Sequence, residues 1–247
     1  MTDFKAISWA AMPGLIAEVQ AIGDELGLPY IAAQADLADP HPMADAEGRP
    51  YAETSFRWID PTHHYWLDRK LALQDTLLSA VRLVAEPFYY QDGRLTTWRP
   101  TGLLAQIDCS HIPGASSLSE AIICPVHLPR GLIGAVYWCA TQPVGVDRIF
   151  ADHAPRLHAT AIRVVSTHNE ARGRPRNAAI SPTLTRREVQ CLRWAAAGKT
   201  DSEIGIILDL SVSTVRFHLR NAAERLGAKG RAQSIQLAVG LGYVGAA

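Results

Sequence analysis

The 247-residue sequence contains no run of about 18 apolar residues, the shortest stretch that indicates a membrane-spanning helix. Its first five residues, Met1–Lys5, lack the basic start and the apolar centre of a secretory signal peptide. We therefore expect a soluble protein of the cytoplasm that does not engage a membrane. The hydrophobic content of 48% is sufficient to fill the core of one large domain or of two ordinary ones.

Cysteine is scarce and irregularly spaced. The four cysteines form no Cys-x-x-Cys pair, so neither a disulfide framework nor a zinc site is expected, and they are predicted to be buried thiols. The adjacent His63 and His64 have no third ligand and predict no metal site. The sequence also lacks a P-loop, a Gly-x-Ser-x-Gly motif and any metal-ligand spacing. These absences argue against an enzyme and against a bound cofactor.

The net charge is zero, but the two ends of the chain differ in sign. Residues 170–247 contain 12 Lys and Arg against 6 Asp and Glu, which gives +6. Residues 1–169 contain 12 against 18, which gives −6. A basic C-terminal part is typical of a module that binds phosphate groups, whereas the acidic remainder is not expected to touch nucleic acid.

The most regular pattern of helix signals lies near the C-terminus. Two capping boxes, Thr185-x-x-Glu188 and Thr200-x-x-Glu203, each indicate the start of a helix. Ser211 is typical of the N-cap of a third helix, and a glycine that tolerates a left-handed backbone follows the first helix and the third. The pattern predicts four helices, which cover residues 186–197, 204–208, 212–226 and 232–241.

The predicted third helix has one apolar face and one polar face. Its apolar residues recur at steps of three and four and form a single stripe: Val212, Val215, Leu219, Ala222 and Leu226. The opposite face carries Ser213, Arg216, Phe217, Arg220 and Asn221. Two helices of this length joined by a tight turn form a helix-turn-helix, whose second helix enters the major groove of DNA. The C-terminal part is therefore interpreted as a DNA-reading module.

A set of residues spread over about 60 positions forms one recognisable motif. Its members are Leu184-Thr185-Arg186-Arg187-Glu188, Leu192, Trp194, Gly198-Lys199-Thr200, Glu203-Ile204, Ser211, Thr214-Val215, His218, Leu226-Gly227 and Arg231. Together they resemble the LuxR-type helix-turn-helix, and in particular its quorum-sensing branch. Two small departures are Gly205, where the family favours Ala, and Asp209 before the turn.

The resemblance implies a set of DNA contacts. Arg216 and Arg220 take the positions whose guanidinium groups reach base edges, while Lys199 and Thr200 take positions that meet the DNA backbone. The residue types agree, because an arginine that binds guanine through two donors supplies about 1–3 kcal/mol of discrimination. The alternative is that both arginines belong to a solvated helix face. The full predicted DNA-binding set is Lys199, Thr200, Ser213, Thr214, Arg216, Arg220 and Asn221.

Residues 1–169 predict a mixed domain of helices and strands. The order of elements indicates an α/β/α sandwich around a central antiparallel sheet. A linker at 170–182 and an all-α four-helix domain at 183–247 follow it, so the predicted fold class of the whole chain is α+β. Residues 92–117 are left unassigned, because glycines and prolines divide them. The predicted helices cover 4–26 with a break at Pro13-Gly14, 61–70, 77–85 and 147–169, and the predicted strands cover 30–35, 53–59, 120–128 and 132–140, the last two as a hairpin about Pro129-Arg130-Gly131.

The order, length and hairpin of this domain resemble the autoinducer-binding domain of LuxR-type regulators, which encloses an N-acyl-homoserine lactone. The resemblance implies a small-molecule effector, with Asp75 at the position of an aspartate that accepts a hydrogen bond from the ligand amide. Asp75 is also a predicted helix N-cap. The implied ligand-binding set is Trp58, Tyr65, Trp66, Asp75, Tyr90 and Tyr137.

Several positions of this set depart from the family. Thr62 replaces the tryptophan that donates a hydrogen bond to the lactone carbonyl, and Ala121 and Tyr137 add bulk. A buried carbonyl that lacks its donor costs about 1–3 kcal/mol, so we expect a non-standard acyl-homoserine lactone or a different small molecule. Departures of this kind also resemble the "solo" LuxR-type regulators, which lack a partner synthase.

The favoured hypothesis is a ligand-responsive transcriptional regulator that binds double-stranded DNA as a homodimer, on a partly palindromic operator. RNA polymerase is a further candidate partner. One alternative is that the N-terminal domain serves dimerisation or protein interaction without a ligand and that its aromatic residues only fill a core. A phosphorylated receiver domain is disfavoured, because residues 1–169 show no parallel strands that end in an acidic cluster.

Overall fold

The computed structural model describes residues 3–60, 76–109, 112, 117–173 and 183–245. They form two compact units, a first unit that contains a β-sheet and a second unit built from four helices. Among the described residues, no helix has the combination of length and apolarity required to cross a bilayer.

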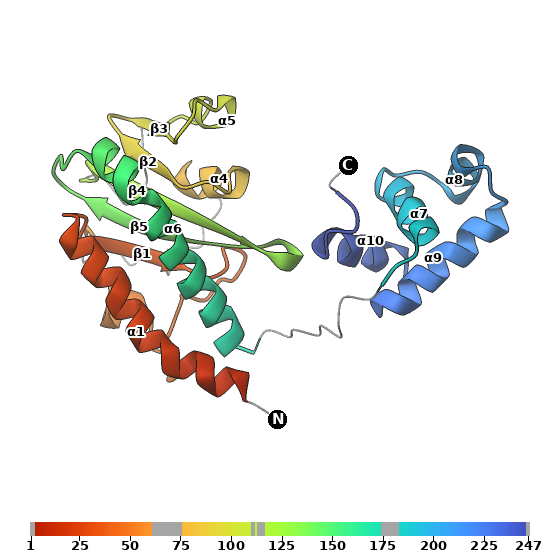
Figure 1. Cartoon of the computed structure of the whole chain (residues 1–247), viewed down its shortest axis with the longest axis horizontal. Helices are drawn as coiled ribbons and strands as arrows, with labels where there is room; N and C mark the ends of the chain where they lie inside the picture. Colours follow the sequence, from red (N-terminus) through yellow and green to blue (C-terminus); the bar gives the residue numbers. More distant parts are fainter. Residues whose placement is uncertain (1–2, 61–75, 110–111, 113–116, 174–182, 246–247) are drawn as a thin grey trace. The chain divides into compact units, whose positions relative to one another are not determined.

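A five-stranded antiparallel sheet forms the centre of the first unit, in the order β1-β5-β4-β2-β3 (Figure 1). β4 and β5 form the predicted hairpin around a 3-10 turn at Pro129–Gly131, and their register pairs Leu128 with Leu132 and Glu120 with Ala140. The prediction of this hairpin is confirmed. The strands are β1 (Tyr30–Gln34), β2 (Phe88–Gln91), β3 (Arg94–Thr96), β4 (Glu120–Leu128) and β5 (Leu132–Ala140).

Helices cover both faces of this sheet. Two long helices, α1 and α6, pack along each other on one face (Figure 1). The shorter α4 packs on β4 and β5. The described helices of the first unit are α1 (Phe4–Glu25), α2 (Tyr51–Thr54), α4 (Thr76–Leu83), α5 (Gly102–Ala105) and α6 (Val146–Ala171).

The alternation of side chains along the strands creates two separate apolar cores. Ile122 and Cys124 of β4 join the core between the sheet and α1 and α6, which we call the α6 layer. Ala121 and Ile123 join the core between the sheet and α4, which we call the α4 layer. The predicted α/β/α sandwich with a central antiparallel sheet is therefore confirmed.

Two buried polar groups tie the sheet to the α6 layer. The indole Nε1 of Trp138 donates a hydrogen bond to the Val19 carbonyl of α1 at 3.0 Å. The buried carboxylate of Glu120 accepts hydrogen bonds from the backbone amides of Val144 at 2.8 Å and Val146 at 3.1 Å. It also accepts one from Gln91 Nε2 at 2.7 Å. Glu120 therefore joins β2, β4 and the start of α6, where helix amides favour a negative charge.

The predicted strand at 53–59 is wrong. The chain instead forms the short helix α2, and Tyr51 and Phe56 both enter the α6 layer. The only backbone hydrogen bond between β1 and this segment within the described residues runs from the Ile31 amide to the Arg57 carbonyl. A single bond does not make a strand ladder, so the alternation of apolar residues here reflects burial on a helical turn and the coil that follows it.

The predicted break at Pro13 is also wrong, because α1 continues through it. Pro13 is exposed and removes one backbone donor, a loss that the packing of α1 along α6 outweighs. Strands β2 and β3 were not predicted from the sequence, since each is shorter than five residues. The predicted helix at 61–70 lies outside the described residues.

The second unit contains the four helices α7 (Arg186–Ala196), α8 (Asp201–Leu208), α9 (Val212–Leu226) and α10 (Arg231–Gly240). Both predicted capping boxes are present, and Gly198 and Gly227 adopt the predicted left-handed conformation with φ of 79° and 67°. In the predicted stripe of α9, Val215 and Ala222 are fully buried and Val212 is only half-buried. All four predicted helices are confirmed, with α8 beginning three residues earlier than expected.

All four cysteines are buried, as predicted, and they are distributed over three cores. Cys124 lies in the α6 layer, Cys109 and Cys139 lie in the α4 layer, and Cys191 lies among α7, α8 and α9. Burial raises the pKa of the Cys124 and Cys191 thiols, which keeps both protonated.

Two glycines of α1 should respond in opposite directions to replacement by alanine. Gly14 is exposed and a Cβ there would meet no atom within 4 Å, so Gly14→Ala should raise the free energy of unfolding by about 0.5–1 kcal/mol. At Gly23 a Cβ would lie 2.8 Å from the Leu28 carbonyl oxygen and 3.3 Å from Trp138 Cδ1. Gly23→Ala should lower the same free energy by about 1–3 kcal/mol. Urea denaturation measures both changes, and a stabilising Gly23→Ala would contradict this packing.

Candidate functional site

The second unit presents α9 as a rigid helix with one open face. The Ser211 hydroxyl accepts a hydrogen bond from the Thr214 amide at 3.1 Å and so caps its N-terminus. Gly227 ends it in a left-handed conformation, and Val215 and Ala222 anchor its inner face at 0% exposure. The position of the outer face is therefore set by packing on one side and by caps at both ends.

Arg216 and Arg220 lie four residues apart on the open face of α9, with side chains 72% and 69% exposed. Residues with this spacing project from the same side of a helix. The Arg220 Cζ lies 5.9 Å from the centroid of the half-exposed Phe217 ring, and its Nε lies 3.9 Å from Glu224 Oε1. Both arginines are thus outside the core, where donors can reach a base edge.

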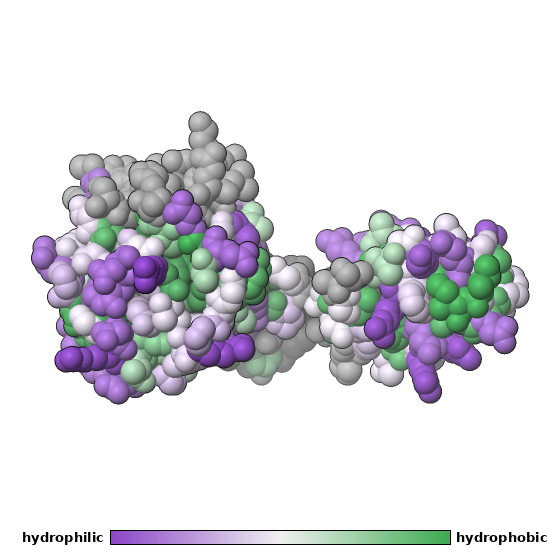
Figure 2. Space-filling view, turned by 90° about the horizontal axis from the view of Figure 1, so that it is seen from above, coloured by the Kyte–Doolittle hydropathy of each residue, from purple (hydrophilic) through white to green (hydrophobic). Residues whose placement is uncertain are grey.

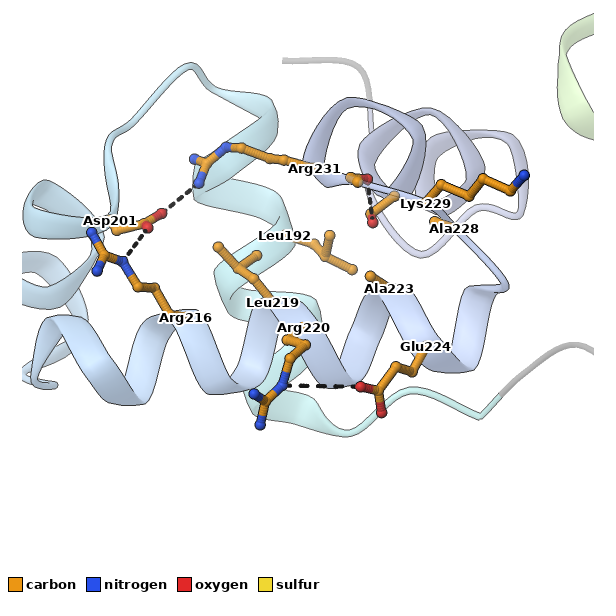
Figure 3. Close-up of a pocket in the computed structure, with 12 residues that line it drawn as sticks. Leu192, Asp201, Arg216, Leu219, Arg220, Ala223, Glu224, Ala228, Lys229 and Arg231 are labelled. Atoms are coloured by element: carbon orange, nitrogen blue, oxygen red, sulfur yellow. Dashed lines mark hydrogen bonds and ion pairs between the residues drawn. The ribbon is translucent and has the colours of Figure 1, made fainter.

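Arg216 is held by a residue that was not predicted to have a role. Its Nε donates a hydrogen bond to Asp201 Oδ2 at 3.2 Å, across from the first turn of α8. Asp201 Oδ1 accepts a second hydrogen bond, from Arg231 at the start of α10 (Figure 3). In the sequence, Asp201 appears only as the residue after the Thr200 cap. No local pattern indicates a contact with residues 15 and 30 positions away.

The turn between α7 and α8 places a second set of polar groups beside these arginines. Thr200 is the N-cap of α8, with its hydroxyl and its amide both bonded to Glu203. These hydrogen bonds hold the pKa of the Glu203 carboxyl below its ordinary value. Lys199 Nζ lies 3.7 Å from Glu203 Oε1 and is half-exposed. The helix N-terminus and the Lys199 ammonium together favour an anionic group such as a phosphate.

The remaining residues of the predicted DNA-binding set lie on α9 as expected. The Ser211 hydroxyl lies 2.8 Å from the Ser213 hydroxyl and 2.7 Å from the Thr214 hydroxyl. Both hydroxyls therefore belong to the capped first turn. Asn221 is half-buried beside Arg220. The structure brings all seven predicted residues onto α9 and the turn before α8.

A hollow of about 420 Å³ opens beside the two arginines, between α9 and the start of α10 (Figure 3). Its charged lining is Asp201, Arg216, Arg220, Glu224, Lys229 and Arg231, an excess of two positive charges. Figure 2 shows hydrophilic side chains over much of this unit together with an apolar patch. The excess of positive charge around this hollow can attract a polyanion to α9.

The first unit offers a different kind of surface in the α4 layer. The strand register aligns Tyr137 of β5 with Ala32 of β1 and Ile123 of β4. One row further along the same face, Tyr90 of β2 lies opposite Ala121 of β4. Trp58, Tyr90 and Tyr137 are thus three predicted ligand residues that the fold places around one apolar core.

The neighbour of Tyr90 faces the other side of the sheet. Tyr89 packs on Phe150 with ring centroids 5.0 Å apart, and Trp98 packs on the same ring at 5.4 Å. Both are therefore part of the α6 side. Burial raises the pKa of the Tyr90 phenol, as do the nearby Cys109 and Asp92, so its hydroxyl remains protonated.

Three predicted ligand residues, Tyr65, Trp66 and Asp75, lie outside the described residues, as do His63 and His64. Within the described part of the chain, no group of three or more His, Cys, Asp or Glu side chains has the spacing to hold a metal ion. The described residues offer hydrogen-bond donors on the exposed face of α9, and phenol and indole groups beside the apolar core of the α4 layer.

Comparison with known proteins gives a family match for the second unit and relatives for longer parts of the chain. Residues 182–238 match the family model described as "Bacterial regulatory proteins, luxR family". The chain is 29% identical over 200 residues to the transcriptional activator protein VanR of Vibrio anguillarum. This alignment covers 78% of this chain and 72% of VanR. It is 34% identical over 117 residues to the HTH-type quorum sensing-dependent transcriptional regulator VjbR of Brucella ovis. This alignment covers 47% of this chain and 44% of VjbR.

Among solved structures, SdiA of Escherichia coli is similar over 93% of this chain and 90% of SdiA, with 18% sequence identity and a TM-score of 0.44.

Removal of the α9 cap should destabilise the second unit. Ser211→Ala deletes the hydroxyl that accepts from the Thr214 amide, and it should lower the free energy of unfolding of this unit by about 1 kcal/mol. Ser202→Ala is the matched control, because Ser202 is exposed within the first turn of α8 and is not its cap. Hydrogen exchange of the α9 amides reports the difference. Equal protection in the two variants would show that Ser211 does not hold the first turn.

Proposed function

We propose that this chain, which belongs to the LuxR-type family of bacterial transcriptional regulators, recognises a partly palindromic DNA operator as a homodimer in the cytoplasm. It is a DNA-binding regulator rather than an enzyme. The observation that supports the proposal most directly is the pair of exposed arginines on α9, a helix capped at both ends and anchored by Val215 and Ala222.

In the proposed complex, α9 lies in the major groove. Arg216 and Arg220 bind base edges, since the N7 and O6 atoms of guanine match two donors of a guanidinium group. Lys199 and Thr200, at the exposed N-terminus of α8, bind the phosphate backbone and set the register of α9. Ser213, Thr214 and Asn221 contact the DNA beside them.

Dimerisation follows from the size of this reading surface. One short helix buries too little area for specific affinity, and two half-sites about one helical turn apart supply the rest. α10 is the proposed pairing element, because Val239 is exposed on it while Ala238 faces the core of its own unit. RNA polymerase is the proposed protein partner of the DNA-bound dimer.

The α4 layer is the proposed effector site. Its central positions pair small residues with aromatic ones, Ala121 opposite Tyr90 and Ala32 opposite Tyr137. An apolar molecule with a polar end fits this chemistry, because the layer is apolar and includes the phenol groups of Tyr90 and Tyr137 and the indole group of Trp58. The effector is an acyl-homoserine lactone or another small molecule of that character. It acts through different affinities for the DNA-competent and DNA-incompetent states.

The two basic contacts on DNA should have separable effects. Arg220→Ala should relax base preference at one position of each half-site and cost about 1–3 kcal/mol per contact. Lys199→Ala should weaken binding to all sequences alike and reduce the slope of log K against log salt by about one. The measurement is fluorescence anisotropy with duplexes that the unchanged chain selects from a random library, at several salt concentrations.

Arg156→Ala is the control for this pair, since Arg156 lies on the first unit in an exposed ion pair with Glu25. It should leave both base preference and salt slope unchanged. If Arg220→Ala reduces only the salt slope, Arg220 is a phosphate ligand. If no duplex is selected under any condition, the DNA-reading proposal fails.

Two neighbouring tyrosines of β2 test the effector site. A compound that binds the folded chain at 100 times its Kd should add about 2.7 kcal/mol of stability, visible as a higher melting midpoint. Tyr90→Phe should weaken the active compound about two- to tenfold through loss of one hydrogen bond. Tyr89→Phe, on the opposite face of the sheet, should not change its affinity.

The compounds to test are acyl-homoserine lactones of different chain length, together with any molecule that mass spectrometry finds in extracts of the purified chain. If no compound raises the midpoint and none co-purifies, the first unit acts without a ligand, as a dimerisation or protein-interaction domain. Equal losses in both tyrosine variants would move the site away from the α4 layer.

A further inference from the structure

Asp201 is an acidic group on a surface that is proposed to approach DNA. Its side chain is 24% exposed, and both of its carboxylate oxygens accept hydrogen bonds from arginines. Oδ2 accepts from Arg216 Nε on α9, and Oδ1 accepts from Arg231 Nη1 on α10 (Figure 3). An acid near a phosphate backbone lowers affinity through charge repulsion. Its presence here therefore requires a compensating role.

The contact with Arg216 involves one particular donor. A guanidinium group has five N–H donors, of which four lie on the two terminal Nη atoms. Asp201 accepts from Nε, so both Nη atoms remain available at the outer end of a side chain that is 72% exposed. Guanine offers two acceptors, N7 and O6, on one edge. The observed contact thus holds Arg216 by its inner nitrogen and leaves its outer nitrogens for a base.

Arg220 provides a comparison within the same helix. Its partner Glu224 lies at 3.9 Å, and both side chains are about 70% exposed. Exposed ion pairs of this kind contribute little free energy to holding a side chain in place, and salt screens their attraction. Arg220, beside this distant carboxylate and the half-exposed Phe217 ring, is held more loosely than Arg216, which is bonded at 3.2 Å to a carboxylate that a second arginine fixes in place.

We propose that Asp201 is a positioning residue that orders Arg216 for base recognition and thereby raises sequence specificity at the expense of general DNA affinity. This inference rests on the proposed role of Arg216 as a base reader. An arginine that is already ordered loses less rotamer freedom when it binds, and the saving per immobilised side chain corresponds to about two- to tenfold in affinity. The benefit appears only on the correct base, whereas the repulsion from Asp201 acts on every sequence.

The same contacts indicate that Asp201 can be changed without unfolding the second unit. Arg231 also donates a hydrogen bond from Nη2 to the Lys199 carbonyl, so α10 stays tied to the turn before α8 when the Asp201 carboxylate is absent. The N-terminus of α8 keeps its Thr200–Glu203 capping box. Asp201→Asn is a milder second variant, because its amide oxygen can still accept from Arg216 Nε.

The experiment measures a specificity ratio with the full-length chain. The two probes are a duplex that the unchanged chain selects from a random library, and a scrambled duplex of equal length and composition. Fluorescence anisotropy gives the Kd of each probe at one fixed salt concentration, and the ratio of the two values is the specificity. Melting scans confirm that each variant is folded at the temperature used.

Asp201→Ala should tighten binding to the scrambled duplex and lower the specificity ratio about three- to tenfold. Asp201→Asn should tighten scrambled binding similarly, because the charge is lost, with a smaller fall in the ratio. Glu224→Ala is the matched control: it removes an acid beside the other arginine, so it should tighten both duplexes alike and leave the ratio unchanged. In an Arg216→Ala background, the further change Asp201→Ala should no longer alter the ratio.

The inference is overturned if Asp201→Ala tightens both duplexes equally, since Asp201 would then act only by repulsion. It is also overturned if the ratio rises, which would mean that Asp201 withholds Arg216 from DNA, or if Glu224→Ala lowers the ratio as much. Failure of the underlying function is seen separately: Arg216→Ala alone would then leave the ratio of the unchanged chain intact.

Discussion

The first unit depends on the pairing of β4 with β5. These two nine-residue strands lie at the centre of the sheet, and their successive side chains point alternately into the α6 layer and the α4 layer. On one side, Trp138 and Glu120 attach the sheet to α1 and to the first residue of α6 through hydrogen bonds that are themselves buried. On the other side, the layer beneath α4 contains the aromatic residues proposed to meet an effector. One pairing thus supports a rigid layer and a candidate binding layer.

The parts of the fold that could be predicted are those whose signal is local. The hairpin turn at Pro129–Gly131 and the capping boxes of α7 and α8 involve residues at most four apart, and all were predicted correctly. The alternation of Phe56 and Trp58 with polar residues in 53–59 does not indicate a strand, because the two side chains lie in the coil after α2 and pack against two different cores. Strands β2 and β3 are too short to show a period of their own.

The candidate sites divide in the same way. The exposed positions of Arg216 and Arg220 follow from the helical period of α9, because burial of Val215 and Ala222 leaves only the opposite face open. The contact of Asp201 with Arg216 could not be predicted, since it depends on how α8 and α9 pack. The placement of Tyr90 and Tyr137 in one layer required the strand register.

The distribution of the four thiols has a practical consequence. Three of the apolar cores contain a cysteine: Cys124 lies beneath α6, Cys109 and Cys139 lie beneath α4, and Cys191 lies among α7, α8 and α9. A thiol reagent reaches such a group only when the surrounding packing opens. The unmodified chain therefore carries its own reporters of local unfolding, and the order in which these sites are alkylated would rank the stabilities of the three cores that contain a thiol.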